Sequence, residues 1–346
     1  MRFRTMETLL KSDRGEVVKA KYIDLARDID YYVQHHYRVW VTNVAEVATS
    51  NLRAPVLGPA PILGANDDIG IPTPPYFVNF SKELTMLIRE SKCLDKMGFV
   101  VPEVAANVAL QEEKFVLYIM QLKGMLKRYE DVYNSLLPVE RIVLKKQFTE
   151  LQNSIKPGFD RLNWNSLHIP TFLNDCNKAI QTFSSRLTQV RKEAASIENI
   201  VNSINDAVLV DPNIFKGRIY HVGTFYEKID EYRSQKIMKL VEKYKSIGSI
   251  LLKIESLVAG TGTCKSPVLA EYYNYWEKRV YNAITVMLIR GIASLKTLFQ
   301  AHNDANAKPT LPFCEVKATM AGKDIVLNPS FPELSKYFSR TIKQIG

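Results

Sequence analysis

Residues 259–266 have the spacing closest to that of a nucleotide-binding loop, and they read Ala-Gly-Thr-Gly-Thr-Cys-Lys-Ser. A phosphate-binding loop follows the pattern G-x-x-x-x-G-K-[ST], because its two glycines let backbone N–H groups surround the phosphate. Ala259 and Cys264 stand at those two positions, and Pro267 removes an N–H group that an anion would use at the start of the next helix. We therefore predict a flexible turn between two long helices, with no nucleotide or other cofactor.

The histidines give no metal-binding pattern. His35 and His36 are adjacent, so their side chains point to different sides of a helix. His168, His221 and His302 belong to separate elements and lack the spacing of a zinc motif. No G-x-S-x-G motif for a nucleophilic serine is present either. The sequence thus predicts no catalytic residue, no metal ligand and no enzyme activity for this chain.

The chain is basic, with a formal net charge of +10 and a pI near 9.2. Such a charge is compatible with nucleic acid, a membrane surface or an acidic protein partner. The lysines and arginines are scattered between acidic residues along helices, however, which is typical of a solvated helix face. We expect neither nucleic acid nor a membrane as a partner. The candidates for binding an acidic protein partner are the four lysines where basic residues are densest: Lys236, Lys239, Lys243 and Lys245.

Residues 272–279, Tyr-Tyr-Asn-Tyr-Trp-Glu-Lys-Arg, combine aromatic rings that could stack on bases with cations that could bind phosphates. Tyr272, Trp276 and Arg279 share one helix face with Val280, however. A long cationic side chain can lay its aliphatic part on apolar surface and keep its charge in water. Packing inside a helical bundle is therefore the preferred interpretation of this stretch.

An uninterrupted apolar seam predicts the longest element of the chain. Its members are Leu173, Cys176, Ile180, Phe183, Leu187, Val190, Ala194, Ile197, Val201 and Ile204. They alternate at spacings of three and four residues, so all of them lie on one stripe of a single helix. A helix from Pro170 to Asp206 is about 55 Å long, and it must bury that stripe against neighbouring helices.

The composition also points to helices. With 15 Gly and 16 Pro in 346 residues, the chain has too few turn residues for a β-sandwich or barrel. No apolar run is long enough to span a membrane as a helix. The four cysteines match no metal or disulfide spacing, which favours a reducing compartment.

Prolines, glycines and capping residues predict where the elements begin and end. Four helices are expected at residues 17–52, 81–98, 102–137 and 138–155, with a short extended piece at 76–80. Asp211-Pro212 and Ser266-Pro267 are expected to open helices of roughly 45 and 35 residues. Residues 312–327 predict a small β-hairpin around Ala321-Gly322, and a final short helix follows.

The predicted fold class is all-α, an elongated stack of antiparallel long-helix bundles with one small β-hairpin near the C-terminus. We divide the chain into five segments. They are an N-terminal helical segment (1–53), a Pro/Gly-rich linker with a short extended piece (54–80), a helical bundle (81–156), the long heptad helices of the next bundle (157–265), and a helix with the hairpin and a short C-terminal helix (266–346).

Three stretches in this order match a known pattern. Residues 78–103 resemble VNFD..L..LIRE.K.L.K.G..IPE, with Ser81 in place of the usual aspartate. Residues 156–169 resemble PG...L.W.S..I, with Asn163 in place of the common threonine, and residues 312–330 resemble LFEV...L....I.F.PS. Together the stretches resemble the N-terminal tail, or stem, of dynein heavy chains, most closely the axonemal ones of the outer-arm type.

The resemblance implies a role in assembly. Dynein heavy chains hydrolyse ATP in a C-terminal ring of AAA+ modules and bind microtubules through a stalk, and neither part belongs to the tail. The implied partners are dynein intermediate chains, light chains and other dynein heavy-chain tails, with the microtubule contacted only indirectly. The implied location is the axoneme of a cilium or flagellum. The sequence thus predicts a non-catalytic scaffold segment of a microtubule motor.

Two other classes remain as alternatives. A free-standing helical adaptor or tether shares the heptad pattern but has no reason to carry the three stretches, and the internal repeat that would favour it is absent. An ATP-dependent enzyme requires a phosphate loop that this sequence lacks. The sequence separates neither outer from inner arms nor axonemal from cytoplasmic forms with certainty.

Overall fold

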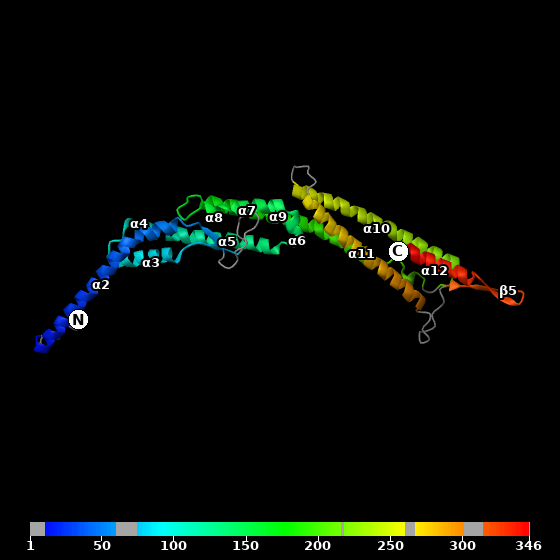
Figure 1. The fold of residues 1–346 in the computed structure, drawn as a ribbon, viewed down its shortest axis with the longest axis horizontal. Coiled ribbons are helices and arrows are strands. Elements are labelled where there is room, and N and C mark those ends of the chain that lie inside the picture. Colours follow the sequence, from blue (N-terminus) through cyan, green and yellow to red (C-terminus); the bar gives the residue numbers. More distant parts are fainter. Residues whose placement is uncertain (1–10, 60–74, 216–217, 260–266, 301–313, 346) are drawn as a thin grey trace. The chain divides into compact units, whose positions relative to one another are not determined.

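The computed structural model describes residues 11–59, 75–215, 218–259, 267–300 and 314–345. The chain forms two compact units, whose helices are labelled in Figure 1. The first unit combines residues 1–135 with 149–182, and the second combines 136–148 with 183–346. The predicted all-α class with a small hairpin is confirmed. The division into five segments stays a prediction.

The first unit is built from helices and one short strand pair. In chain order its elements are α2 (Asp13–Leu52), β1 (Leu57–Pro59), β2 (Tyr76–Val78), α3 (Lys82–Lys96), α4 (Glu103–Leu110), α5 (Glu112–Ser135), most of α7 (Lys145–Ile155), α8 (Pro157–Asp160) and the start of α9 (Ile169–Asn205). β1 and β2 pair antiparallel, with Gly58 opposite Phe77. The predicted first helix and the extended piece at 76–80 are therefore both present.

Local capping chemistry sets the limits of α3 as predicted. The Ser81 hydroxyl accepts a hydrogen bond from the backbone N–H of Leu84 at 3.0 Å, so it satisfies an otherwise unpaired donor at the helix start. Gly98 follows the helix end with φ +83°, a left-handed conformation that favours glycine. The backbone N–H of Gly98 donates to the carbonyl of Asp95 at 3.0 Å.

Trp164 joins the stretches around residues 78 and 164 in the core of the first unit. Its indole N–H donates to the carbonyl of Asn79 at 2.8 Å, and its ring packs edge-on against Phe80, with 4.8 Å between centroids. Gly158 is also required here, because an added Cβ would lie 2.6 Å from Cδ1 of Leu57. Two of the three stretches that carry the family resemblance thus serve one packed corner.

The second unit contains the remaining elements. They are α6 (Pro138–Val143), the C-terminal part of α9, the 3₁₀ helix η2 (Pro212–Phe215), β3 (Tyr220–His221), α10 (Val222–Ala259), α11 (Pro267–Gln300), β4 (Cys314–Glu315), β5 (Lys317–Ala321), β6 (Asp324–Asn328) and α12 (Phe331–Ile345). The C-terminal end of α10 lies next to the start of α11, and Figure 1 shows the two helices separating toward their other ends.

The predicted seam of α9 is confirmed. Nine of its ten members are buried, and Ala194 is half-buried. Along the part in the second unit, side chains tie the helix to its neighbours. Arg191 pairs with Glu140 of α6, Glu198 pairs with Arg279 of α11, and the Ser203 hydroxyl lies 3.1 Å from Nζ of Lys243 in α10.

The predicted packing of Tyr272 and Trp276 is confirmed as well. Both side chains are buried with Val280 on one face of α11. Arg279 on the same helix is committed to its ion pair with Glu198. The rings and the cation of residues 272–279 therefore belong to the bundle, and the stacking platform for bases that this stretch suggested is not formed.

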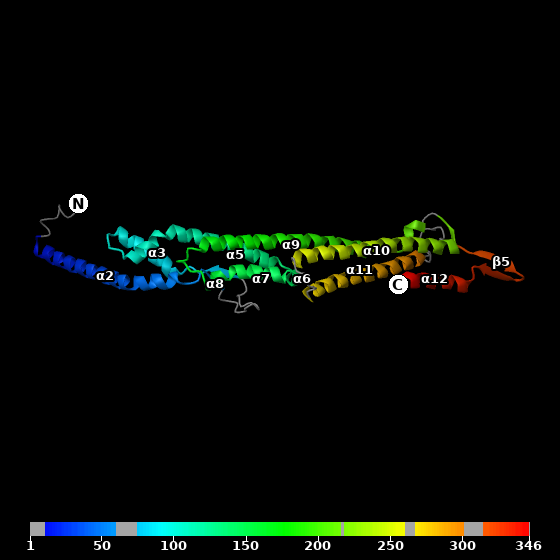
Figure 2. The ribbon, with the colours of Figure 1, turned by 90° about the horizontal axis from the view of Figure 1, so that it is seen from above.

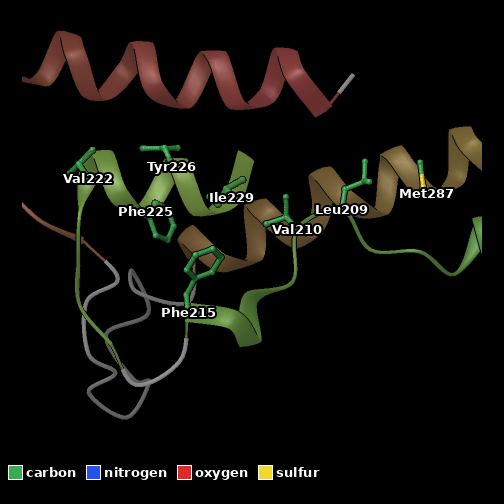
Figure 3. Packing of buried hydrophobic residues seen from close by; sticks show 8 residues of the cluster. All are labelled: Leu209, Val210, Phe215, Val222, Phe225, Tyr226, Ile229 and Met287. Atoms are coloured by element: carbon green, nitrogen blue, oxygen red, sulfur yellow. The ribbon is translucent and has the colours of Figure 1, made fainter. Parts of the chain in front are cut away.

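A second apolar cluster lies at the N-terminal end of α10. Phe215, Val222, Phe225, Tyr226 and Ile229 pack together, and Figure 3 shows Phe215 directed toward Phe225. Their ring centroids lie 4.7 Å apart. Leu209, Val210 and Met287 complete the cluster. β3 pairs parallel with β4 beside it, so residues near the C-terminus also contribute to this core.

One helix prediction is wrong. Asp211-Pro212 opens only the four-residue η2, and α10 begins ten residues later, at Val222. Tyr220 and His221 instead form β3 and pair with Cys314 and Glu315 of β4, so the chain is extended immediately before α10. The expected start at Pro267 is confirmed, with α11 at Pro267–Gln300.

Two predicted helices are interrupted. The helix expected over 102–137 breaks at Gln111 into α4 and α5, and the one over 138–155 breaks at Leu144 into α6 and α7. The hairpin is confirmed, with Ala321 paired to Asp324 across Gly322, whose φ is +72°.

Candidate partner-binding surface

The four lysines proposed from the sequence lie in the central part of α10. With 3.6 residues per turn, Lys236, Lys239 and Lys243 fall on one side of the helix. Lys245 falls on the other side, since about two and a half turns separate it from Lys236. The structure thus brings three of the four residues together and separates the fourth.

Two of these lysines already make contacts within the second unit. Nζ of Lys236 lies 5.1 Å from the ring centroid of Tyr232, which is a cation–π contact on the same helix. Nζ of Lys243 lies within hydrogen-bonding distance of the Ser203 hydroxyl in α9, at 3.1 Å. Lys239, Lys243 and Lys245 are exposed, and Lys236 is half-buried. Lys236 is therefore the one of these four lysines that its own unit partly covers.

The sequence analysis missed an apolar strip on the same helix. We define the α10 strip as Ile237, Val241, Tyr244, Gly248 and Leu252, which recur at spacings of three and four residues on one side of α10. Its four side chains are between 39% and 65% exposed. This spacing is visible in the sequence, but only the structure shows that the strip faces away from the core.

The strip leads into a groove between α10 and α11 of about 530 Å³. Its lining residues are Gly248, Leu251, Leu252, Glu255, Leu269, Ala270 and Tyr273. The Tyr273 hydroxyl donates to Oε2 of Glu255 at 3.0 Å. Burial raises the pKa of Tyr273 to about 12, and the hydrogen bond and negative charge of Glu255 act in the same direction. Tyr273 is therefore neutral at physiological pH, and the groove is mainly apolar.

The charges close to the strip are mixed, because Lys245 borders it, Glu255 lies on the same side one turn after Leu252, and the other α10 lysines point elsewhere. Between residues 236 and 253, α10 carries five lysines and one acidic residue, Glu242. Lys245 lies beside the strip, and Lys253 lies next to it in sequence after Leu252.

A second hollow, of about 820 Å³, lies between α2 and α3 in the first unit. The Trp40 indole N–H donates to Oε2 of Glu90 across it, at 2.9 Å. The Tyr37 hydroxyl donates to the carbonyl of Val100 at 2.6 Å. The first bond joins α2 to α3, the second joins α2 to the segment after α3, and the polar groups named here already have partners within the unit.

The described residues contain no metal-binding cluster. No group of three or more His, Cys, Asp or Glu side chains within them could hold a metal ion. None of the helices in the described ranges has the length and apolar character needed to cross a membrane. The loop-like stretch at 260–266 lies outside the described residues.

Comparison with known proteins points to one family. Residues 1–172 match the family described as "Dynein heavy chain, N-terminal region 1". The chain is 33% identical over 353 residues to the Dynein-1-alpha heavy chain of the flagellar inner arm I1 complex from Chlamydomonas reinhardtii, which covers 99% of the chain. It is 32% identical over 343 residues to dynein axonemal heavy chain 10 from Homo sapiens, which covers 97%. In both cases the chain spans 7% of the relative's length.

The names of these relatives refer to different dynein arms, inner and outer. The dynein gamma chain of the flagellar outer arm from Chlamydomonas reinhardtii is 22% identical over 357 residues, covering 100% of this chain and 8% of that protein. The inner-arm relative from the same alga is 33% identical. The axonemal resemblance is thus confirmed, while its outer-arm detail has the weaker support of the two.

Proposed function

The chain belongs to the dynein heavy chains, as a segment of their N-terminal region, and we propose that it is a non-catalytic scaffold segment of a heavy-chain tail. The observation that carries this proposal is similarity to axonemal heavy chains along 99% of the chain. Long helices with buried seams suit a part that holds other subunits in fixed positions. The Trp164 corner and the buried α9 seam support a stable, load-transmitting structure.

The proposal extends to partners and place. Dynein intermediate chains, light chains and other dynein heavy-chain tails would bind this segment, and the microtubule would be contacted only indirectly. The names of the relatives refer to axonemes and flagella, which supports the axoneme of a cilium or flagellum as the location. The full-length parent would be a microtubule motor ATPase, whereas this segment contributes assembly.

We further propose that the α10 lysines, Lys236, Lys239, Lys243 and Lys245, form part of the docking surface. Three of them share one side of the helix, as described above. Lys245 borders the α10 strip instead. The free-standing adaptor is the alternative function, and the similarity to heavy chains over nearly the whole sequence argues against it.

A pull-down tests the scaffold proposal. The tagged chain, shown by circular dichroism to be helical, is incubated with ciliary extract, and the captured proteins are identified by mass spectrometry. We expect dynein intermediate chains or partner heavy-chain tails. Recovery of neither from the folded chain would overturn the scaffold proposal in favour of the adaptor.

A matched pair of variants tests the lysines. One variant reverses the charge of all four α10 lysines to glutamate. The control reverses four exposed lysines elsewhere in the second unit, Lys192, Lys278, Lys296 and Lys323. Both variants change the net charge equally. We expect partner recovery to fall only for the first variant, and an equal fall for both would contradict a specific role of the α10 lysines.

A further inference from the structure

We propose that the α10 strip, together with the facing side of α11, is the docking site for a helix that continues the line of α12. The heavy-chain segment that follows residue 346 supplies this helix. The assignment rests on the proposed function, since a tail segment of a longer heavy chain has such a continuation. It gives the strip to the heavy chain itself and leaves other faces for separate subunits.

The α10 strip extends a face of α10 that α12 already covers near the start of that helix. Tyr244 of the strip comes about five full turns after Tyr226, so the two side chains lie on the same side of α10. The ring of Tyr337 in α12 stacks on that of Tyr226, with 5.3 Å between centroids and 10° between planes. Leu334 and Ile342 of α12 pack against the same apolar cluster. The strip is therefore continuous with an interface that is already formed.

Exposure along this face of α10 rises where α12 ends. Tyr226 and Arg233 are each 9% exposed, whereas the strip begins at Ile237 with 39%. α12 contacts α10 and runs in the same direction (Figure 1). Its last residue, Ile345, comes about 12 Å after Tyr337 along the helix axis. An equal distance along α10 from Tyr226 ends just after Arg233. The apolar face thus becomes exposed at the point where α12 no longer covers it.

α11 provides the second wall of the site. Leu288 of α11 packs against the cluster that α12 contacts. Toward the start of α11, Ile284, Tyr281 and Tyr273 follow on the same side of the helix. Ile284 and Tyr281 are exposed, and Tyr273 lines the groove of about 530 Å³ next to Leu252. Two mainly apolar walls therefore continue in line with α12, and one further helix can pack against both.

The dimensions of the site favour a continuation of the heavy chain as its occupant. From Ile237 to Leu252 the strip extends for about four turns, or roughly 22 Å. The end of α12 lies beside the start of the strip, so residues that directly follow α12 reach it without a linker. A continuing helix also donates its N–H groups to the last carbonyls of α12, which a helix of another subunit does not do. The relatives have enough chain for this, since 346 residues span 7% of their length.

Cysteine accessibility tests the proposal. Val241 in the strip and Val286, on the side of α11 away from the groove, are 44% and 43% exposed, so Val241→Cys and Val286→Cys are a matched pair. Each variant is made in the 346-residue chain and in a chain extended by the next 20 or so residues of its own heavy chain, about enough for the roughly 22 Å strip. Alkylation by iodoacetamide is followed by peptide mass spectrometry, which separates the introduced sites from the native cysteines.

We expect the extension to slow alkylation of Val241→Cys at least tenfold and to leave that of Val286→Cys unchanged. An unchanged rate for Val241→Cys in the extended chain, shown by circular dichroism to be helical, would overturn the proposal. Protection that appears only after ciliary extract is added would also overturn it, and would assign the groove to a separate subunit. If the extended chain does not fold, the same residues added as a synthetic peptide should protect Val241→Cys, and a scrambled peptide should not.

Urea unfolding gives a second measurement. The extension should raise the unfolding midpoint, because it buries the strip. Val241→Asp should remove this gain, whereas Val286→Asp should retain it. No gain on extension, or an equal loss of the gain in both variants, would contradict the assignment. Since neither measurement depends on capture of a ciliary protein, failure here leaves the pull-down result intact, and a failed pull-down leaves these results intact.

Discussion

Two long helices of similar length carry apolar seams with the same spacing, but one seam is buried and the other is exposed. α9, with 37 residues, buries its seam, and Ile197 at the centre is 0% exposed. α2, with 40 residues, has Val18, Tyr22, Leu25 and Ile29 at alternating spacings, yet these side chains are between 54% and 66% exposed. Its buried residues, Val44, Ala48 and Leu52, lie near its end.

The difference arises from what lies beside each seam. α9 has α6, α10 and α11 as neighbours in the second unit, each joined to it by a polar contact. The N-terminal part of α2 extends past α3 and α4, and no other described element of the first unit lies along it (Figure 2). Periodicity therefore specifies a helix and one apolar face, while stabilisation requires a partner for that face.

The largest expected effect comes from the same substitution in each seam. Ile197→Ala should lower the free energy of unfolding of the second unit by about 2–5 kcal/mol, because it removes buried apolar atoms and leaves a cavity. Ile29→Ala should change stability by no more than about 0.5 kcal/mol, since the side chain is exposed. Urea unfolding followed by circular dichroism measures both. Similar losses at the two sites would show that the α2 seam is packed.

Ion pairs beside the two seams should also differ. Arg191 of α9 donates two hydrogen bonds to the Glu140 carboxylate, at 2.7 and 2.8 Å, and Glu140 is buried. Because Arg191 is partly exposed, we expect Glu140→Gln to cost about 1–2 kcal/mol. On α2, Asp24 and Arg27 form an exposed pair at 3.4 Å. Asp24→Asn should have no measurable effect in the same urea titration. A loss of stability from Asp24→Asn as large as that from Glu140→Gln would contradict the expected difference between the two ion pairs.

The Glu140 pair also predicts a pH dependence. Burial by itself raises the pKa of Glu140, but hydrogen bonds from Arg191 and the backbone N–H of Leu137, together with the Arg191 charge, leave that pKa below its ordinary value. A carboxyl with a lowered folded-state pKa stabilises the fold above its unfolded-state pKa, near 4.3. This contribution is lost as pH falls through the folded-state pKa. Stability should therefore fall less steeply below about pH 4.5 in Glu140→Gln than in the unmodified chain, and identical slopes would contradict this account.

Helix caps give the smallest pair of effects. Ser81 caps α3 within the packed first unit, and Ser12 caps the exposed start of α2 by accepting from the N–H of Gly15 at 3.2 Å. Ser81→Ala should cost about 1 kcal/mol in global unfolding. Ser12→Ala should speed amide hydrogen exchange in the first turns of α2 and leave global unfolding unchanged. A global loss from Ser12→Ala would indicate that the start of α2 unfolds together with the rest of its unit.

Local chemistry made part of the fold predictable. The Ser81 cap, the Gly98 turn, the Pro267 start and the hairpin at Gly322 depend on a few adjacent residues, and all four were predicted correctly. The breaks at Gln111 and Leu144 were missed, because neither carries a glycine or proline. The start signal at Pro212 was overestimated, since Tyr220 and His221 pair as a short strand with Cys314 and Glu315, which lie far away in the sequence.

The candidate surface was predicted only in part. The α10 lysines were chosen by charge density, and their role in binding stays a prediction. The structure adds that Lys236 contacts the ring of Tyr232 and that Lys243 lies against Ser203. The apolar strip has the same spacing as a buried seam, so its outward orientation was not readable from the sequence. A pattern records which residues share a face and does not record what that face contacts.

The sequence by itself determined the helices, the seam of α9, the capping residues and, through three ordered stretches, membership of the dynein heavy chains. These features depend on residues near one another in the chain. Tertiary structure decided which seams are buried, where two helices break, and which face of α10 is open. Each of those outcomes depends on contacts between residues far apart in sequence, whose free energy no local pattern contains.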